Sequence, residues 1–399
     1  MKVSIPTQLT IDRYEEFIAR IAAQPDGAEL DLELPVLTKY SLFGGWACAI
    51  QAVNTWGRKS STRRVLLRRE KISKDATIAS AIKRPHKFCA TMIARSIEDA
   101  STGEQLRPLV NAFARNAVDE QASSPTGLAL GPLRWFVFVD HSTRGFDRNF
   151  YIESPDRQPQ PRQLMQISEV ISSIVKRSLT QASRRNRLDS REVDHLGRLF
   201  YELFLNTHEH GTRGKYKSDW LAPGLRVVYA NGINLSRSNV DSSLVSMPVL
   251  GEYVDSLKLD ARRVGFVEIS IVDSGLGFCG RWLADRSCTD AQILPSIDAE
   301  YEIFKKCFSF RQTSTDSSTK GNGLPVVMDR LTRLQGFMRV RSGRLSLYRN
   351  FVTRPFTGAG DCEFFDWITC QPALKQTTPM SPVSGVALTL LIPVGASYE

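Results

Sequence analysis

Between residues 189 and 211 the apolar positions recur at steps of three and four, which predicts one long amphipathic helix. The apolar stripe consists of Val193, Leu196, Phe200, Leu203 and Thr207. Asp189 and Glu192 have the spacing of a capping box, in which two side chains satisfy backbone N–H groups of the first turn. Gly211 follows the last periodic residue and predicts the end of the helix. A polar line runs beside the stripe and consists of His195, Glu202, Asn206 and Glu209.

Beyond this helix the pattern predicts strands that alternate with loops and one further helix. The strands are expected at residues 225–230, 265–272, 337–341 and 385–393. The polar residues 231–263 predict a long insertion or a pair of loops. A helix is expected to begin at Gly323 and to run to Leu334, because Gly336 breaks the pattern. Residues 188–399 are therefore predicted to form one α/β domain.

Residues 1–153 carry a separate pattern, which predicts a smaller α/β domain. The expected elements are a helix at 10–23, a strand at 29–34, a glycine turn at 41–45, a helix at 46–56, a strand at 64–67, a mainly helical region at 76–122 and a β-hairpin of 134–140 with 149–153. Residues 154–187 would join the two domains. Their polar start with Pro155, Pro159 and Pro161 predicts a linker, and an amphipathic helix is expected at 164–179.

Composition limits the class of protein but does not identify it. The chain has 399 residues, 42% hydrophobic and 24% charged, which are the proportions of an ordinary globular protein. No run of eighteen apolar residues predicts a membrane span, and the first residues lack a signal-peptide pattern. The seven cysteines are scattered without a CxxC pair, which favours reduced thiols and a cytoplasmic location.

The net charge of +10 raises the question of an acidic partner. Basic residues gather in residues 58–71 and again at Arg184, Arg185 and Arg187. A solvated face is the first interpretation, because no helix-turn-helix, zinc finger or aromatic RNA-binding signature accompanies the two clusters. Nucleic-acid binding remains open as an alternative.

Glu202 and Asn206 carry the first candidate chemistry. They are four residues apart and therefore lie on one helix face, about one turn from each other. A carboxylate and an amide oxygen in this arrangement are suited to hold a hydrated Mg²⁺ and to polarise a water. A Glu and an Asn on a solvated helix face would look the same, so the interpretation depends on the motifs downstream.

Two glycine-containing motifs follow. The strand at 265–272 runs into Asp273, and Gly275 and Gly277 come directly after. The carboxylate is suited to accept from an exocyclic amine, while the glycines allow a ring or a phosphate to approach the backbone. Residues 312–320 are polar and predicted to be mobile; Lys320, Gly321, Gly323 and Leu324 close that segment. A glycine pair that opens a helix is suited to bind phosphate.

In this order, the motifs resemble those of the GHKL superfamily of gyrase, chaperone, histidine-kinase and mismatch-repair ATPases. ELFLNTHEHG resembles the N-box, DSGLGF and GNGL the two glycine boxes, and IFKKCFSF the phenylalanine-rich segment of the histidine-kinase branch. The resemblance implies an α/β sandwich with a mixed sheet, ATP and Mg²⁺ as ligands, and Asn206 as the metal residue. It implies that Asp273 reads the adenine amine and that Glu202 acts catalytically on water. Gly275, Gly277, Gly321, Gly323 and Leu324 would shape the nucleotide pocket, and Lys320 would approach the γ-phosphate.

The chain departs from this family in several places. The segments 206–273 and 343–385 are long, and Val386 stands where many relatives have threonine. The helix at 164–179 has no histidine and His195 lies inside the N-box helix, so autophosphorylation of the usual kind is not expected. The order of strand, glycine turn and helix near Ser41 and Gly44 resembles a STAS-like domain over about seventy residues.

The sequence therefore predicts a cytoplasmic protein that binds ATP and Mg²⁺, with an N-terminal domain that regulates it or binds a protein partner. Slow ATP hydrolysis or an ATP-driven switch is the expected work. A serine kinase of the anti-sigma-factor type, a nucleotide sensor without hydrolysis and an ATP-gated nucleic-acid binder are the alternatives. Formation of a homodimer also remains open.

Overall fold

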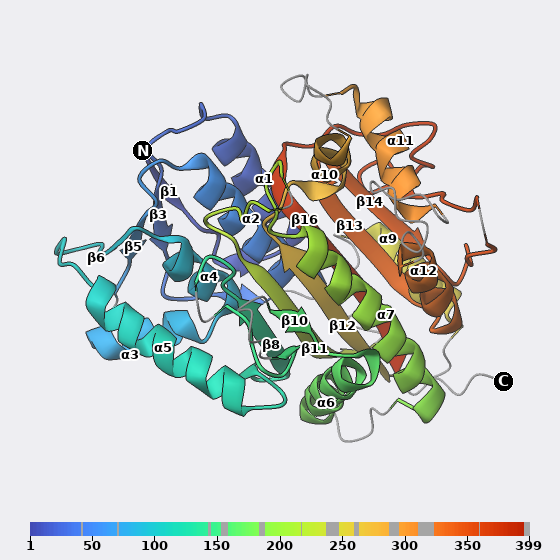
Figure 1. The fold of residues 1–399 in the computed structure, drawn as a ribbon, viewed down its shortest axis with the longest axis horizontal. Coiled ribbons are helices and arrows are strands. Elements are labelled where there is room, and N and C mark those ends of the chain that lie inside the picture. The colour runs from blue at the N-terminus through green and yellow to red at the C-terminus, as the bar shows by residue number, and fades with distance from the viewer. Residues whose placement is uncertain are drawn as a thin grey trace.

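An antiparallel sheet lies at the centre of the computed structural model (Figure 1). The structure describes residues 1–40, 43–69, 72–142, 145–152, 159–182, 188–216, 218–236, 247–258, 263–286, 295–309, 323–358 and 360–394. In these residues the sheet has eight strands in the order β15 (Phe365–Asp366), β14 (Leu345–Asn350), β13 (Phe337–Gly343), β16 (Val383–Val394), β12 (Arg263–Asp273), β11 (Arg226–Ser236), β8 (Leu133–Phe138) and β7 (Leu128–Leu130).

A second, smaller sheet is parallel and belongs to the N-terminal part of the chain. Its order is β1 (Lys2–Ser4), β3 (Asp31–Leu34), β5 (Arg64–Leu67) and β6 (Ser96–Asp99). The connections contain α1 (Ile11–Ala22), α2 (Gly45–Lys59), α3 (Lys74–Ile82) and α4 (Pro85–Ile93), and α5 (Arg107–Ser123) follows β6. The short strands β2 (Gln8–Leu9) and β4 (Lys39–Tyr40) pair in parallel beside it. The expected elements at 10–23, 29–34, 46–56 and 64–67 are confirmed by α1, β3, α2 and β5.

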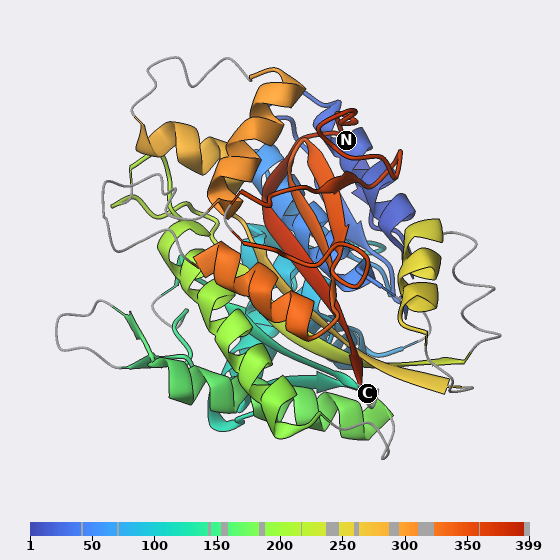
Figure 2. The ribbon, with the colours of Figure 1, turned by 90° about the vertical axis from the view of Figure 1, so that its right-hand side faces the viewer.

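The large sheet has helices on both faces (Figure 2). On one side lie α6 (Leu164–Ala182), α7 (Ser190–His210) and α12 (Gly323–Arg333), and their apolar residues share one core with Phe136, Val228 and Ile271. On the other side α2 and α9 (Pro248–Ser256) pack against the alternate positions, such as Val227 and Val272. The period of two along each strand is what divides the residues between the two cores.

The remaining elements of the described residues are one pair of short antiparallel strands and two helices. They are β9 (Tyr151–Ile152) with β10 (Gln160–Pro161), α10 (Gly277–Asp285) and α11 (Ile297–Phe308). None of the helices in the described part of the chain combines the length and the apolar character needed to span a membrane.

Several expectations differ from the structure. The large sheet is antiparallel in every pairing of the described residues rather than mixed. The hairpin expected from 134–140 and 149–153 is wrong, because β8 has β7 and β11 on its two edges and β9 pairs with β10. Within the polar insertion expected at 231–263, β11 continues to Ser236 and α9 is a helix.

The N-terminal part is joined closely to the large sheet. Strands β7 and β8 complete its edge, although their residues precede the expected boundary at 153. The carboxylate of Glu15 on α1 accepts from Arg339 at 3.1 Å and from Arg341 at 2.9 Å, and both arginines lie on β13. Those guanidinium groups are almost fully buried, so the ion pairs are shielded from solvent.

Candidate functional site

The alternation along β12 decides which way Asp273 points. Val267, Ile269 and Ile271 belong to the core under α6 and α7, whereas Phe266 and Val272 belong to the core under α2. Asp273 therefore follows the first set and lies on the α7 side, at the end of the strand. The backbone turn after it leads through Ser274 into α10, a helix that was not expected from the sequence.

The carboxylate of Asp273 is held by the backbone. Its Oδ1 atom accepts from Gly275 N at 2.9 Å and from Val386 N at 3.2 Å. Gly277 has a φ of +73°, a conformation that side chains with a Cβ rarely adopt, so the tight turn here requires glycine. These contacts fix the carboxylate at the junction of β12 and β16.

Burial raises the pKa of Asp273 from 3.8 to about 7, against the lowering effect of the two backbone hydrogen bonds and of Arg226. Only 5% of the residue is exposed. The group therefore titrates near neutral pH, where a small change of environment alters its charge.

The end of α7 lies directly against Asp273. Gly211 is the C-cap residue, with a helical φ of −68° rather than the left-handed conformation common at helix ends. A Cβ at Gly211 would lie 2.9 Å from Asp273 Cβ and 2.6 Å from Thr207 O. Glycine is required here by close packing on the candidate site, not by its backbone angle.

We expect Gly211→Ala to lower the free energy of unfolding by about 1–3 kcal/mol, because the added methyl overpacks this contact. Gly280→Ala is the matched control, since among the described residues that Cβ would meet Leu276 Cβ, in the N-cap residue of α10, at 3.1 Å. Thermal denaturation of both variants measures the difference. Equal stability of the two would contradict the close packing of α7 on Asp273.

Glu202 and Asn206 lie together on α7 and face the start of α12. A Cβ at Gly323 would lie 3.0 Å from Glu202 Oε2 and 3.7 Å from Asn206 Nδ2. The Nδ2 atom of Asn206 is buried without a hydrogen-bond partner among the described residues. An orphaned amide beside a helix N-terminus is suited to a ligand, because the N-terminus attracts anionic groups.

Asn206 lies five residues before Gly211, or about 7–8 Å along the helix axis. The last turns of α7 therefore connect two groups of predicted residues: Glu202, Asn206, Gly323 and Leu324 at one place, and Asp273, Gly275 and Gly277 at the other. Lys320, Gly321 and the predicted mobile segment 312–320 lie outside the described residues.

Glu202 is not an isolated carboxylate. Its Oε1 atom lies 2.6 Å from Arg198 Nη2, one turn earlier on α7. Burial raises the pKa of Glu202, and Arg198 opposes that shift. Only 15% of the Glu202 side chain is exposed, so a water bound to Oε2 would be largely shielded from bulk solvent.

A buried polar network beside Asp273 was missed in the sequence. Arg226 stands opposite Asp273 in the sheet register and forms a two-point ion pair with Asp140, at 2.8 and 2.7 Å. It also donates to the Tyr151 hydroxyl at 2.8 Å, which lies 3.2 Å from His208 Nδ1.

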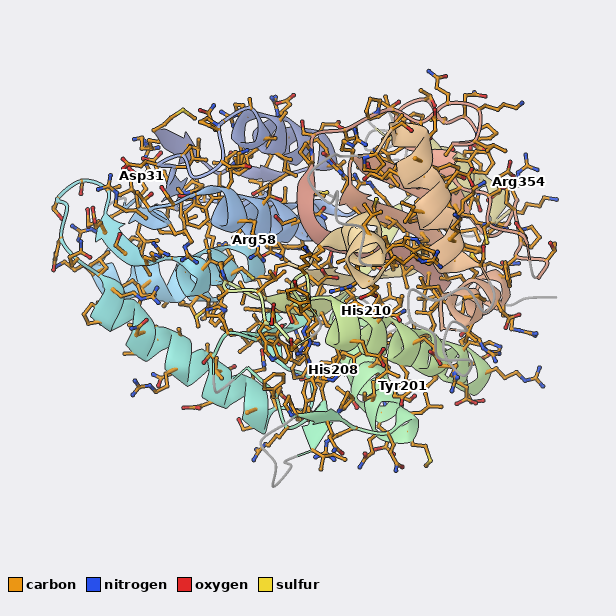
Figure 3. All side chains as sticks on the ribbon, turned by 45° about the horizontal axis from the view of Figure 1, so that its top comes forward. Asp31, Arg58, Tyr201, His208, His210 and Arg354 are labelled. Atoms are coloured by element: carbon orange, nitrogen blue, oxygen red, sulfur yellow. The ribbon has the colours of Figure 1, made fainter. Side chains whose placement is uncertain are left out.

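Figure 3 labels His208 and His210 near the end of α7. Burial lowers the pKa of His208 to about 4, so the imidazole is neutral near neutral pH. The signal available in the sequence was Arg226, a charged residue at the first position of the apolar strand β11.

Acidic neighbours neutralise much of the first basic cluster. Lys59 pairs with Asp26 at 2.6 Å, Arg64 with Asp31 at 2.5 Å, and Arg69 with Asp99. The second cluster at 184–187 lies outside the described residues.

Comparison with family models, with curated proteins and with solved structures gives no match to this chain. The described residues contain no group of three or more His, Cys, Asp or Glu side chains arranged to hold a metal ion.

Proposed function

We propose that this chain binds an adenine nucleotide with Mg²⁺ in the manner of GHKL proteins, on the α7 side of the large sheet. The observation that carries the proposal is the convergence of three separate motifs. Glu202 and Asn206 lie on the last three turns of α7. Asp273 and Gly323 come more than sixty and more than a hundred residues after Asn206 in the chain, yet both lie against this part of α7 or its cap residue Gly211. Gly275 and Gly277 are required by packing and by backbone conformation, so the part of the convergence that points to a ligand is the carboxylate of Glu202 and the amide of Asn206 beside Gly323.

Each residue has a role in this proposal. Asp273 accepts from the exocyclic amine of adenine, and the start of α12 faces the phosphates. Asn206 holds Mg²⁺ through its amide oxygen. Glu202 orients or activates the attacking water, which makes slow hydrolysis or an ATP-driven switch the proposed work. The N-terminal unit, STAS-like in its order of elements, is the proposed regulatory or partner-binding part.

A nucleotide sensor without hydrolysis is the second candidate, and one contact favours it. Arg198 lies 2.6 Å from Glu202 Oε1, and this ion pair opposes the rise in pKa that burial gives the carboxylate, which makes Glu202 a weaker base than it would be without Arg198. In that case ATP would bind and change the conformation while phosphate release stays at the uncatalysed rate.

Calorimetric titration of the full chain with ATP and with GTP, each with and without Mg²⁺, tests the proposal. We expect one site that prefers ATP and requires Mg²⁺ for full affinity. Absence of binding at millimolar ATP, or equal affinity for GTP, would contradict the site described above.

A further inference from the structure

Helix α2 carries a stripe of polar residues, most of which are buried. Gln51, Asn54, Thr55 and Arg58 recur at the helical spacing of three and four residues. The first three are 0%, 3% and 6% exposed, inside a helix whose other buried residues are mostly apolar. Polar side chains in such a place need a reason, because burying an amide costs free energy unless it is fully hydrogen-bonded.

Two members of the stripe hold the backbone of the turn that carries Asp273. Asn54 Nδ2 donates to the carbonyl oxygen of Asp273 at 3.2 Å. Arg58 Nη2 donates to the carbonyl oxygen of Ser274 at 2.9 Å and to that of Pro223 at 3.3 Å. Figure 3 labels Arg58 on α2. These carbonyl groups lie at the strand end, where the sheet ladder of β12 and β16 has stopped.

The other two members hold the neighbouring strand end. Gln51 Nε2 donates to the carbonyl oxygens of Arg341 at 3.0 Å and of Gly385 at 3.5 Å. Thr55 Oγ1 accepts from Ser384 N at 3.1 Å. The next residues close the arrangement, because Gly385 N donates to Gly275 O at 2.8 Å and Val386 N donates to the Asp273 carboxylate.

All four side chains of the stripe therefore contact one group of neighbouring strand ends. Its side chains contact the strand ends of β12, β13 and β16 whose backbones position the Asp273 carboxylate. The amide oxygens of Gln51 and Asn54 are buried without a hydrogen-bond partner among the described residues. The donors of the stripe pair with strand-end carbonyl groups beyond the sheet ladder, so the stripe fixes the orientation of these backbone segments even though two amide oxygens remain unpartnered.

We propose that Asn54 and Arg58 are positioning residues for the nucleotide site, through which the N-terminal unit sets the affinity and the adenine preference of that site. The inference rests on the proposed function. Helix α2 is part of the connection from β3 to β5, two neighbouring strands of the parallel sheet, so any ligand or partner that displaces it moves the turn after Asp273. The coupling is reciprocal: nucleotide binding also stabilises the present placement of α2.

The test compares Asn54→Leu and Arg58→Met with wild type in titrations with Mg-ATP and Mg-GTP. Leucine keeps the branched shape of Asn54 but cannot donate, and methionine keeps the stem of the exposed Arg58. We expect each variant to lose about tenfold in ATP affinity, which corresponds to one buried hydrogen bond. The preference for ATP over GTP should fall with it, because the carboxylate that reads adenine is no longer held in place.

Tyr253→Phe is the matched control. Tyr253 donates to the carbonyl oxygen of Leu391 at 3.2 Å, so this change removes a buried hydrogen bond at the opposite end of β16. We expect it to lower stability without changing the ratio of ATP to GTP affinity. A purely structural role for Asn54 would make Asn54→Leu behave like this control.

The outcomes separate the two proposals. If wild type does not bind ATP, the proposed function fails. If wild type binds ATP with adenine preference and both α2 variants keep that preference, the proposed function stands and the positioning role is wrong. Should Asn54→Leu not fold, Arg58→Met decides the question alone, because its side chain lies at the surface.

Discussion

Glu202→Ala is expected to keep its affinity for ATP while its phosphate release falls about 10²–10⁴-fold, the usual effect of removing a general base. Ground-state binding needs no base, so the variant should accumulate bound, unhydrolysed nucleotide. Loss of Glu202 also removes the ion-pair partner of Arg198, which lies 2.6 Å from its carboxylate.

Asn206→Ala is expected to fail at an earlier step. Its amide is half-buried, faces Gly323 and has an Nδ2 atom without a hydrogen-bond partner in the described part of the chain, so the loss removes a ligand-facing group rather than a structural contact. Mg²⁺-dependent ATP binding should therefore disappear, whereas the fold should remain. Glu169→Ala on the exposed side of α6 is the control for a simple loss of a helical polar side chain, and we expect it to match wild type.

The pair of variants distinguishes three accounts of α7. Different failures of Glu202→Ala and Asn206→Ala support an ATPase. For a sensor, Glu202→Ala should be silent while Asn206→Ala still loses binding. Wild-type affinity and turnover in both variants would mean that the polar face of α7 is merely solvated, and would contradict the proposed site. Affinity and phosphate release, measured side by side, give the answer.

Asp273→Asn is expected to have two effects of opposite sign: weaker binding of ATP and a more stable fold. The amide offers a donor where adenine needs an acceptor, so ATP affinity should fall about 10- to 100-fold, in line with hydrogen bonds to charged groups. The amide has no charge to bury, which is the source of the gain in stability.

The sign of the stability effect follows from the raised pKa. The folded state binds the proton of Asp273 up to about pH 7, whereas the unfolded state releases it near the ordinary value of 3.8. Between those values the folded state holds more protons, so a rise in pH destabilises the wild-type fold through this group. The gain of Asp273→Asn should therefore grow from about pH 4 to about pH 7, up to an upper bound of roughly 4 kcal/mol.

Other charges face Asp273 and set the size of this effect. Arg226 on β11 lowers the pKa and Asp140, paired with Arg226, raises it. Denaturant unfolding of wild type and Asp273→Asn at about pH 5 and pH 8 measures the difference. A stability advantage that is equal at both values, or a loss at about pH 8, would show that the buried carboxylate is not the titrating group.

Local sequence signals predicted the elements whose causes are local. The capping box of α7 is present as expected, since Asp189 Oδ1 accepts from Glu192 N at 2.8 Å and Glu192 Oε2 from Asp189 N at 2.7 Å. The apolar stripe of that helix and the strand before Asp273 were likewise found, because periodicity alone defines them. The helical period of 3.6 residues and the strand period of two then determine which side chains of α7 and β12 face each other.

The contacts that the sequence did not predict have nonlocal causes. Strand β8 pairs with β11, about ninety residues later in the chain, and no pattern near residue 134 specifies that partner. The ion pair of Arg226 with Asp140 joins two segments that are equally far apart. The stripe on α2 was visible as Gln51, Asn54, Thr55 and Arg58 in an apolar helix, but what these side chains contact appears only when the helix packs on the sheet.

The most direct test of the central claim is a crystal structure of the full chain with a non-hydrolysable ATP analogue and Mg²⁺. The account predicts the adenine amine within hydrogen-bond distance of the Asp273 carboxylate, the metal at the Asn206 amide oxygen and the phosphates at the start of α12. A nucleotide bound at any other place, with Asp273 and Asn206 not in contact with it, would contradict the account.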